Sequence, residues 1–146
     1  MGKPVSGCAV TVTLVKEDKI GFIRRAMDDT YPGLLTPPGG KVEMQDGTFC
    51  YDDIPYYSLE GAAVREVIEE AGIVIDPNRL KYFCSLTLPN GRVIVSFYYL
   101  IDGTELTRSD FESNIVWLSF FDLDKGLLVP GMVDEMKLLK KIIEGL

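Results

Sequence analysis

The sequence predicts a single α/β domain, because strand-like and helix-like segments alternate along a chain of 146 residues. This length suits one compact domain and is too short for two ordinary ones, so we expect one domain over residues 1–146. Residues 5–15 alternate apolar with small or hydroxyl-bearing residues, as a strand does. The proline-free segment between Ser58 and Gly72 has the 3.6-residue period of an amphipathic helix. Ser58 is its predicted N-cap, and Gly72 is expected to end it in a left-handed conformation.

The other segments are expected to form two hairpins, a further strand and a closing helix. In chain order they are a strand at 20–25 that pairs with 5–15 through a turn at 17–19, a loop at 26–35, strands at 81–88 and 92–101 joined by Pro89-Asn90-Gly91, a strand at 115–118, and a helix carrying Val133, Met136, Leu139 and Ile143. The Asn-Gly pair is a strong hairpin signal.

The composition excludes several classes of function. A net charge of −7 argues against polymeric DNA or RNA as a partner, since such binding depends on Lys and Arg. The absence of histidine excludes histidine-based triads and histidine metal ligands. Cys8, Cys50 and Cys84 contain no C-x-x-C pair, so we expect reduced thiols. With no long apolar run and no signal peptide, we expect a cytoplasmic protein that does not bind membranes.

Carboxylates gather on one face of the predicted helix. Glu66, Glu69 and Glu70 are spaced three and four residues apart, so they should face away from the apolar side. That apolar side is formed by Val64, Val67, Ile68 and Ala71. Arg65 can pair with Glu69, but one arginine cannot neutralise three carboxylates, whereas Mg²⁺ prefers such oxygen ligands. A solvated acidic face is the alternative interpretation of the same cluster.

A glycine-rich segment, Pro37-Pro38-Gly39-Gly40-Lys41-Val42-Glu43, precedes this helix and would let the backbone approach a ligand closely. Together with the helix it resembles the signature of Nudix hydrolases, G-x5-E-x7-R-E-U-x-E-E-x-G-U, in which U is a bulky aliphatic residue. The second half matches from Arg65 to Ile73, and Gly40 fits the opening glycine. Asp46 stands where the family has glutamate, and residues 47–64 separate it from Arg65, about eleven more than the pattern allows.

We place the extra residues at 47–57, a segment that is both aromatic and acidic. It is either a loop that stacks on a base or sugar, with Tyr51 and Tyr57 as candidates, or a surface loop whose aromatic residues pack on one another. The counterpart of the family's first glutamate is Asp46, Asp52, Asp53 or no residue at all, and the sequence leaves these alternatives open.

The resemblance implies the Nudix fold, an α/β architecture with a mixed β-sheet sandwiched between α-helices. It also implies Mg²⁺-dependent or Mn²⁺-dependent hydrolysis of a nucleoside diphosphate linked to another moiety, by attack of water on phosphorus. The implied metal ligands are the Gly40 carbonyl and the carboxylates of Glu66, Glu69 and Glu70. Arg65 would orient Glu69, and the base would be Glu70 or an acid from the loop at 102–113, with Glu112 preferred to Asp110. Lys41, Arg24 and Arg25 are candidates for phosphate contacts.

Several substrates fit this class: nucleoside triphosphates, oxidised nucleotides and nucleotide sugars. Pro89 lies sixteen residues after Ile73, a spacing typical of family members that hydrolyse ADP-ribose, although a hairpin turn explains the same proline. A nucleotide-sensing module without turnover is the alternative function, because the first half of the signature is altered. Many family members dimerise, so a homodimer is also expected.

Overall fold

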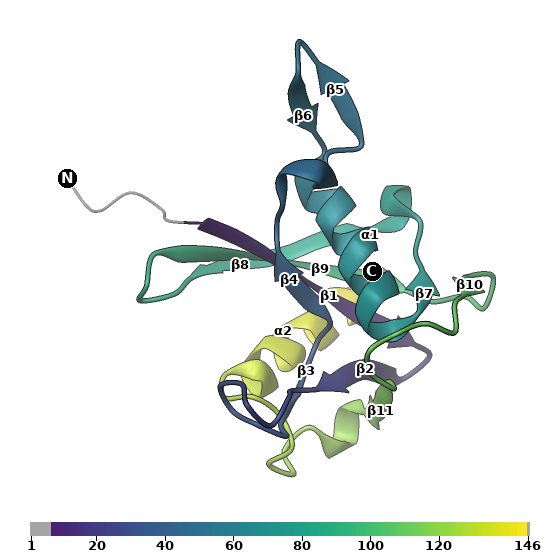
Figure 1. The fold of residues 1–146 in the computed structure, drawn as a ribbon. Coiled ribbons are helices and arrows are strands. Elements are labelled where there is room, and N and C mark those ends of the chain that lie inside the picture. Colours follow the sequence, from purple (N-terminus) through teal and green to yellow (C-terminus); the bar gives the residue numbers. More distant parts are fainter. Residues whose placement is uncertain (1–6, 146) are drawn as a thin grey trace.

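A mixed β-sheet forms the centre of the structure, a computed structural model that describes residues 7–145 (Figure 1). Its strands are β1 (Gly7–Lys16), β2 (Lys19–Arg24), β3 (Leu35–Thr36), β4 (Gly39–Lys41), β8 (Lys81–Thr87), β9 (Arg92–Leu100) and β11 (Val116–Ser119). The order across the sheet is β11-β2-β1-β9-β8, with β3 beside β2 and β4 beside β1. Strands β1 and β9 pair in parallel, whereas β1 with β2 and β8 with β9 are antiparallel.

The remaining elements surround this sheet. They are helices α1 (Ser58–Ala71) and α2 (Met132–Glu144), the short strands β5 (Phe49–Tyr51), β6 (Ile54–Tyr56), β7 (Ile73–Val74) and β10 (Leu106–Thr107), and the 3₁₀ turns η1 (Met44–Asp46), η2 (Pro77–Arg79) and η3 (Phe120–Asp122). No helix within residues 7–145 is long and apolar enough to cross a lipid bilayer.

Helices α1 and α2 cover opposite faces of the sheet, so two hydrophobic cores form. Val67 of α1 packs with Val12 of β1 and Phe97 of β9, whereas Met136 of α2 packs with the next β9 residue, Tyr98. Consecutive strand residues point to opposite faces, which is why β9 contributes to both cores. The predicted sandwich of a mixed sheet between helices is therefore confirmed.

Both predicted hairpins are present. Gly91 donates its N–H to the carbonyl of Leu88 at 2.9 Å, which closes the turn that Pro89 opens between β8 and β9. In the first hairpin, Val5 and the residue after it lie outside the described residues, and the predicted loop at 26–35 ends one residue early because Leu35 begins β3. The turn interpretation of Pro89 is confirmed.

The predicted buried and exposed faces of helix α1 are partly wrong. Glu66 is only 9% exposed, whereas Val64 and Ile68, expected in the core, are half-buried. The reason is that α1 packs against β4 as well as against β1 of the sheet. A Cβ atom on Gly40 would lie 2.4 Å from Glu66 Oε1, so this carboxylate is enclosed between α1 and β4.

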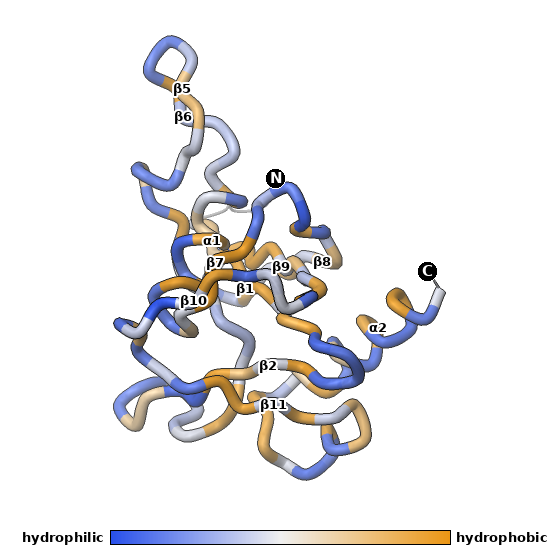
Figure 2. Tube along the Cα trace, turned by 90° about the vertical axis from the view of Figure 1, so that its right-hand side faces the viewer, coloured by the Kyte–Doolittle hydropathy of each residue, from blue (hydrophilic) through white to orange (hydrophobic). Residues whose placement is uncertain are grey.

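The insertion at 47–57 folds as a hairpin rather than a loop, and it projects from the body of the protein (Figures 1 and 2). Strands β5 and β6 pair with Phe49 opposite Tyr56, and Thr48 donates its N–H to the Tyr56 carbonyl at 3.0 Å. Asp52 and Asp53 form its tip with φ of 51° and 62°, as a tight two-residue hairpin turn requires. The first and last residues of the insertion therefore lie side by side.

Helix α1 begins one residue earlier than predicted. Tyr57, not Ser58, occupies the N-cap, and Ser58 is the first helical residue. Tyr57 has φ 58° and ψ 36°, a left-handed conformation that is uncommon for a bulky residue. At the other end Gly72, with φ 71°, ends the helix as predicted.

Replacing Tyr57 by Asn should stabilise the protein by about 1 kcal/mol, because Asn tolerates the left-handed region and is a favoured N-cap residue. The Tyr57 side chain is 63% exposed, so little packing is lost. Urea unfolding measures the change. Tyr57→Phe, which keeps the backbone penalty, should leave stability unchanged, and a Tyr57→Asn protein less stable than the parent would contradict this account.

Candidate active site

Strand β4 lies so close to β1 and α1 that side chains have no room at Gly39 and Gly40. A Cβ atom on Gly39 would lie 2.2 Å from the Val10 carbonyl oxygen, and one on Gly40 would meet the Glu66 carboxylate. Glycine is needed here for close approach. The structure thus places this backbone directly against the acidic helix α1, and its predicted approach to a ligand stays a prediction.

Glu66 and Glu70 lie on successive turns of α1, and both face β4. Glu70 Oε1 accepts a hydrogen bond from the Gly39 N–H at 3.2 Å. Burial raises the pKa of Glu70 to about 8, and its hydrogen bond with Glu66 and the negative charges of Glu66 and Glu112 act in the same direction. Carboxylates placed this close favour a shared proton or a bound cation.

Arg65 donates hydrogen bonds to four residues, and one of them is Glu66 of this pair. Its Nε and Nη2 atoms donate to both Asp46 oxygens at 2.6 and 3.0 Å, a bidentate arrangement. Its Nη1 atom lies 2.8 Å from Glu66 Oε1 and 3.3 Å from Glu69 Oε2, and Nη2 donates to the Lys41 carbonyl at 2.9 Å. The predicted Arg65–Glu69 ion pair is present, but Asp46 is the closer partner.

Of the candidates for the family's first glutamate, Asp46 is the one that contacts Arg65. Its side chain is 2% exposed, and the hydrogen bond from Arg65 lowers the pKa of Asp46. Asp52 and Asp53 instead lie at the exposed hairpin tip. A Cβ atom on Gly61 would lie 1.7 Å from the Asp46 carbonyl oxygen, so η1 rests directly on α1. The signal available in the sequence was the position of Asp46, six residues after Gly40.

The acidic loop before β11 is attached to the C-terminal end of α1. The N–H groups of Glu112 and Ser113 donate to the carbonyls of Glu69 and Glu70 at 2.9 and 3.0 Å. The last carbonyls of a helix have no partner within it, so this loop satisfies them. The same bonds carry Glu112, rather than Asp110, to the cavity that Glu70 lines.

This cavity has a volume of about 370 Å³ and lies between β2, β4 and the end of α1. Its acidic lining residues are Asp29, Glu70 and Glu112, and its basic lining residues are Arg24 and Arg25. Arg24 Nη1 donates to the Gly33 carbonyl at 2.8 Å, and Arg25 pairs with Asp29. Charges of both signs therefore line one cavity, which suits a phosphate that is bound together with a cation.

Other predicted residues lie apart from this cavity. Glu69 is exposed and, with Arg65 and Asp46, lines a neighbouring cavity of about 470 Å³. The Lys41 side chain is exposed, and what this residue brings to the site is its carbonyl. Tyr57 lines a third cavity beside the hairpin, whereas Tyr51 is exposed on β5.

The donor chemistry fits a hard divalent cation, because every candidate ligand is an oxygen atom. Glu66 and Glu70 are brought together against the Gly40 backbone, and Glu69 turns towards Arg65. Within residues 7–145, no group of three or more Asp, Glu, Cys or His side chains is arranged as it would be around a metal ion. The structure thus brings two of the three predicted carboxylates together.

Comparison with known proteins identifies the family. The family profile described as NUDIX domain matches residues 6–139. A search of curated proteins finds no match. Among solved structures, the E. coli ORF135 protein is similar with a TM-score of 0.64 and 23% identity, over 95% of this chain and 91% of that one.

Two further structures show the same fold. An Ap4A hydrolase from C. elegans has a TM-score of 0.65 at 15% identity, over 97% of this chain and 100% of its own. A MutT NUDIX hydrolase from Burkholderia pseudomallei has a TM-score of 0.61 at 23% identity, over 94% of this chain and 98% of its own. With the family profile spanning most of the chain, this protein belongs to the Nudix hydrolase family.

Proposed function

We propose that the protein is a Mg²⁺-dependent pyrophosphohydrolase that cleaves a nucleoside diphosphate linked to another moiety, by attack of water on phosphorus. The observation that carries this proposal is the Glu66–Glu70 pair, which is held against the Gly39–Gly40 backbone at a cavity with acidic and basic walls. Arg65 Nη1 neutralises only part of the charge of this pair, from 2.8 Å away on the Glu66 side, and a divalent cation with substrate phosphates would relieve the remaining repulsion.

Each residue of the site has a role in this proposal. The Gly40 carbonyl and the carboxylates of Glu66, Glu69 and Glu70 hold Mg²⁺, with Mn²⁺ as a substitute. When bound, the cation supplies Lewis-acid activation of water and phosphate oxygens. Glu112 accepts the proton of the attacking water, because it lines the same cavity as Glu70.

The cationic residues divide between positioning and binding. Arg65 positions Glu66 and Glu69 through its Nη1 atom, and Asp46 holds Arg65. Arg24 is a better phosphate-binding candidate than Lys41, because Arg24 lines the cavity of Glu70 and Lys41 does not.

Small nucleotides are the substrates that this site supports. Nucleoside triphosphates, oxidised nucleotides, nucleotide sugars and dinucleoside polyphosphates all contain the required diphosphate, and the similar structures include a MutT protein and an Ap4A hydrolase. ADP-ribose has weaker support, because the turn at Pro89 accounts for that residue. The Arg65–Asp46 pair also counts against a sensor without turnover, since the altered half of the signature still contacts the acidic helix.

Glu69→Gln and Glu70→Gln should each lower kcat by about a hundredfold or more, because each removes a negative charge from the metal site. Release of phosphate products from a nucleotide panel with Mg²⁺ or Mn²⁺ measures this, and circular dichroism checks the fold. Glu144→Gln, in α2, is the matched control and should behave as the parent. Near-parental kcat in both site variants would refute the proposed metal site.

Asp46→Asn should lower kcat more than it raises KM, and should destabilise the fold by about 2 kcal/mol, because Arg65 loses a buried, charged partner. Asp46→Glu restores the charge and the residue type of the family signature, so its kcat should lie close to that of the parent. If Asp46→Asn matched the parent in both kcat and stability, Asp46 would have no positioning role.

The stability difference between the parent and Asp46→Asn should depend on pH. The pKa of Asp46 is lowered in the folded state, so its stabilising effect is complete above the unfolded pKa of about 4 and is lost as pH falls through the lower folded value. Urea unfolding at pH 7 and at successively lower pH should show the difference shrinking below about pH 4. A constant difference would mean that charge is not its cause.

A further inference from the structure

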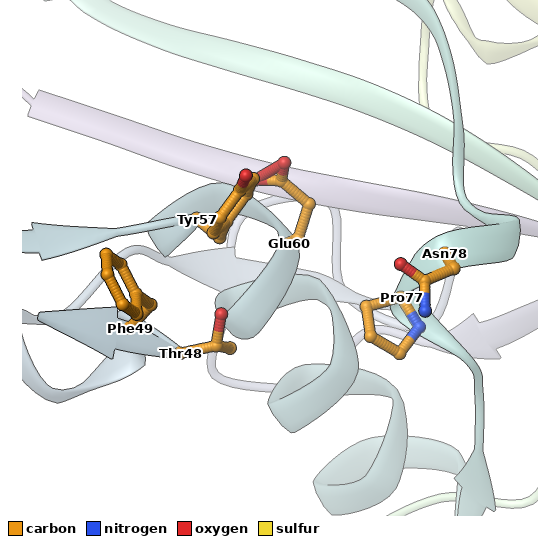
Figure 3. A pocket seen from close by; sticks show the side chains of 6 residues that line it. All are labelled: Thr48, Phe49, Tyr57, Glu60, Pro77 and Asn78. Carbon is orange, nitrogen blue, oxygen red and sulfur yellow. The ribbon is translucent and has the colours of Figure 1, made fainter.

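The third cavity, separate from the one that holds Glu70, lies between the inserted hairpin and η2 (Figure 3). Its volume is about 430 Å³, and its lining residues are Thr48, Phe49, Tyr57, Glu60, Pro77 and Asn78. Four of these six come from the insertion and the first turn of α1. The extra residues in the Nudix signature therefore build one wall of this cavity.

The cavity offers two exposed aromatic rings. Phe49 and Tyr57 are 56% and 63% exposed, and in Figure 3 both rings lie on the hairpin side, with Pro77 and Asn78 across from them. The Phe49 ring packs against the Tyr56 ring, and the two ring centroids are 5.9 Å apart. Tyr57 is held in the left-handed conformation described above, an unfavourable choice for an N-cap. Such local strain concentrates at functional sites.

Polar groups around the rings select the chemistry of the ligand. Glu60 contributes a carboxylate, Thr48 a hydroxyl and Asn78 an amide. Glu60, together with the acidic tip of the hairpin, disfavours a phosphate in this cavity. A carboxylate and an amide beside aromatic rings instead match the edge of a nucleobase that carries an amino group, because the base can stack while its N–H groups find acceptors.

The cavity continues towards the carboxylates of the active site. The neighbouring cavity of about 470 Å³ shares Thr48 and Pro77 with it and reaches Arg65 and Glu69. Glu60 and Glu69 are nine residues apart on α1, which corresponds to about 14 Å along the helix axis. Glu70 instead lines the cavity that Arg24 also lines, and that cavity shares no lining residue with the other two. Phosphates bound at α1 therefore have space for a substituent on both sides.

We propose that the hairpin cavity binds a second nucleobase of the substrate, so that the preferred substrates are two nucleosides joined by a polyphosphate. This assignment rests on the proposed pyrophosphohydrolase function, because only phosphates held at Glu66, Glu69 and Glu70 connect the two sides. A nucleoside triphosphate would fill the catalytic cavity and leave the hairpin cavity empty.

The site itself is tested without metal or turnover. Adenosine, guanosine, cytidine and uridine are titrated into the protein in EDTA, and backbone amide shifts are followed by NMR. At least one amino-bearing nucleoside should shift the amides of Thr48, Glu60 and Asn78, and Tyr57→Asn, which suits the backbone, should abolish that shift. Tyr51→Ala, which removes an exposed tyrosine of the same hairpin, is the control. Absence of shifts with all four, or shifts that Tyr57→Asn leaves intact, overturns the site.

The substrate class is tested by kinetics with diadenosine tetraphosphate and ATP in Mg²⁺. Tyr57→Asn should raise KM for the dinucleotide about fivefold or more while KM for ATP stays constant, because one stacked base is lost. Equal effects on both substrates would overturn the proposed substrate class. If the parent hydrolyses neither, the proposed function fails, whereas the nucleoside titration still decides whether the hairpin cavity binds a base.

Discussion

The contact between Arg65 and Asp46 is the interaction on which the arrangement of the site depends. One guanidinium joins η1, the backbone of β4 and two carboxylates of α1. Its planar geometry suits this task, because it donates several hydrogen bonds in fixed directions and stays charged. Without it, the carboxylates of α1 would face only one another, and η1 would lose its charged attachment to the helix.

Close packing of β4 against α1 produces the unusual electrostatics of the site. The absence of side chains at Gly39 and Gly40 lets backbone reach the buried side of the helix, where it encloses Glu66 and hydrogen-bonds Glu70. Two acidic groups then share a poorly hydrated space, which raises the pKa of Glu70. Such a region favours a shared proton or a bound cation, and this links the packing of the fold to the proposed chemistry.

Periodicity and turn residues predicted the helix and the two hairpins, because these are local signals, whereas the sandwich was implied only by the resemblance to the Nudix family. The sequence misplaced Glu66, since burial of that residue depends on β4, which packs on α1 from a distant part of the chain. The sequence also could not decide which of Asp46, Asp52 and Asp53 corresponds to the family's first glutamate, because the inserted residues change the spacing to Arg65. In the structure the insertion folds as a hairpin with adjoining ends, which leaves Asp46 next to Arg65 and favours Asp46 among the three.

Binding of Mn²⁺ to the free protein, measured by electron paramagnetic resonance, tests directly whether α1 carries the catalytic metal site. We expect the parent to bind Mn²⁺ saturably. Glu66→Gln should weaken the Mn²⁺ affinity at least about tenfold, because this carboxylate is enclosed between α1 and β4. Glu144→Gln should bind as the parent does. Failure of the parent to bind Mn²⁺, or equal affinity in the Glu66→Gln protein, would contradict the assignment of this helix as the catalytic metal site.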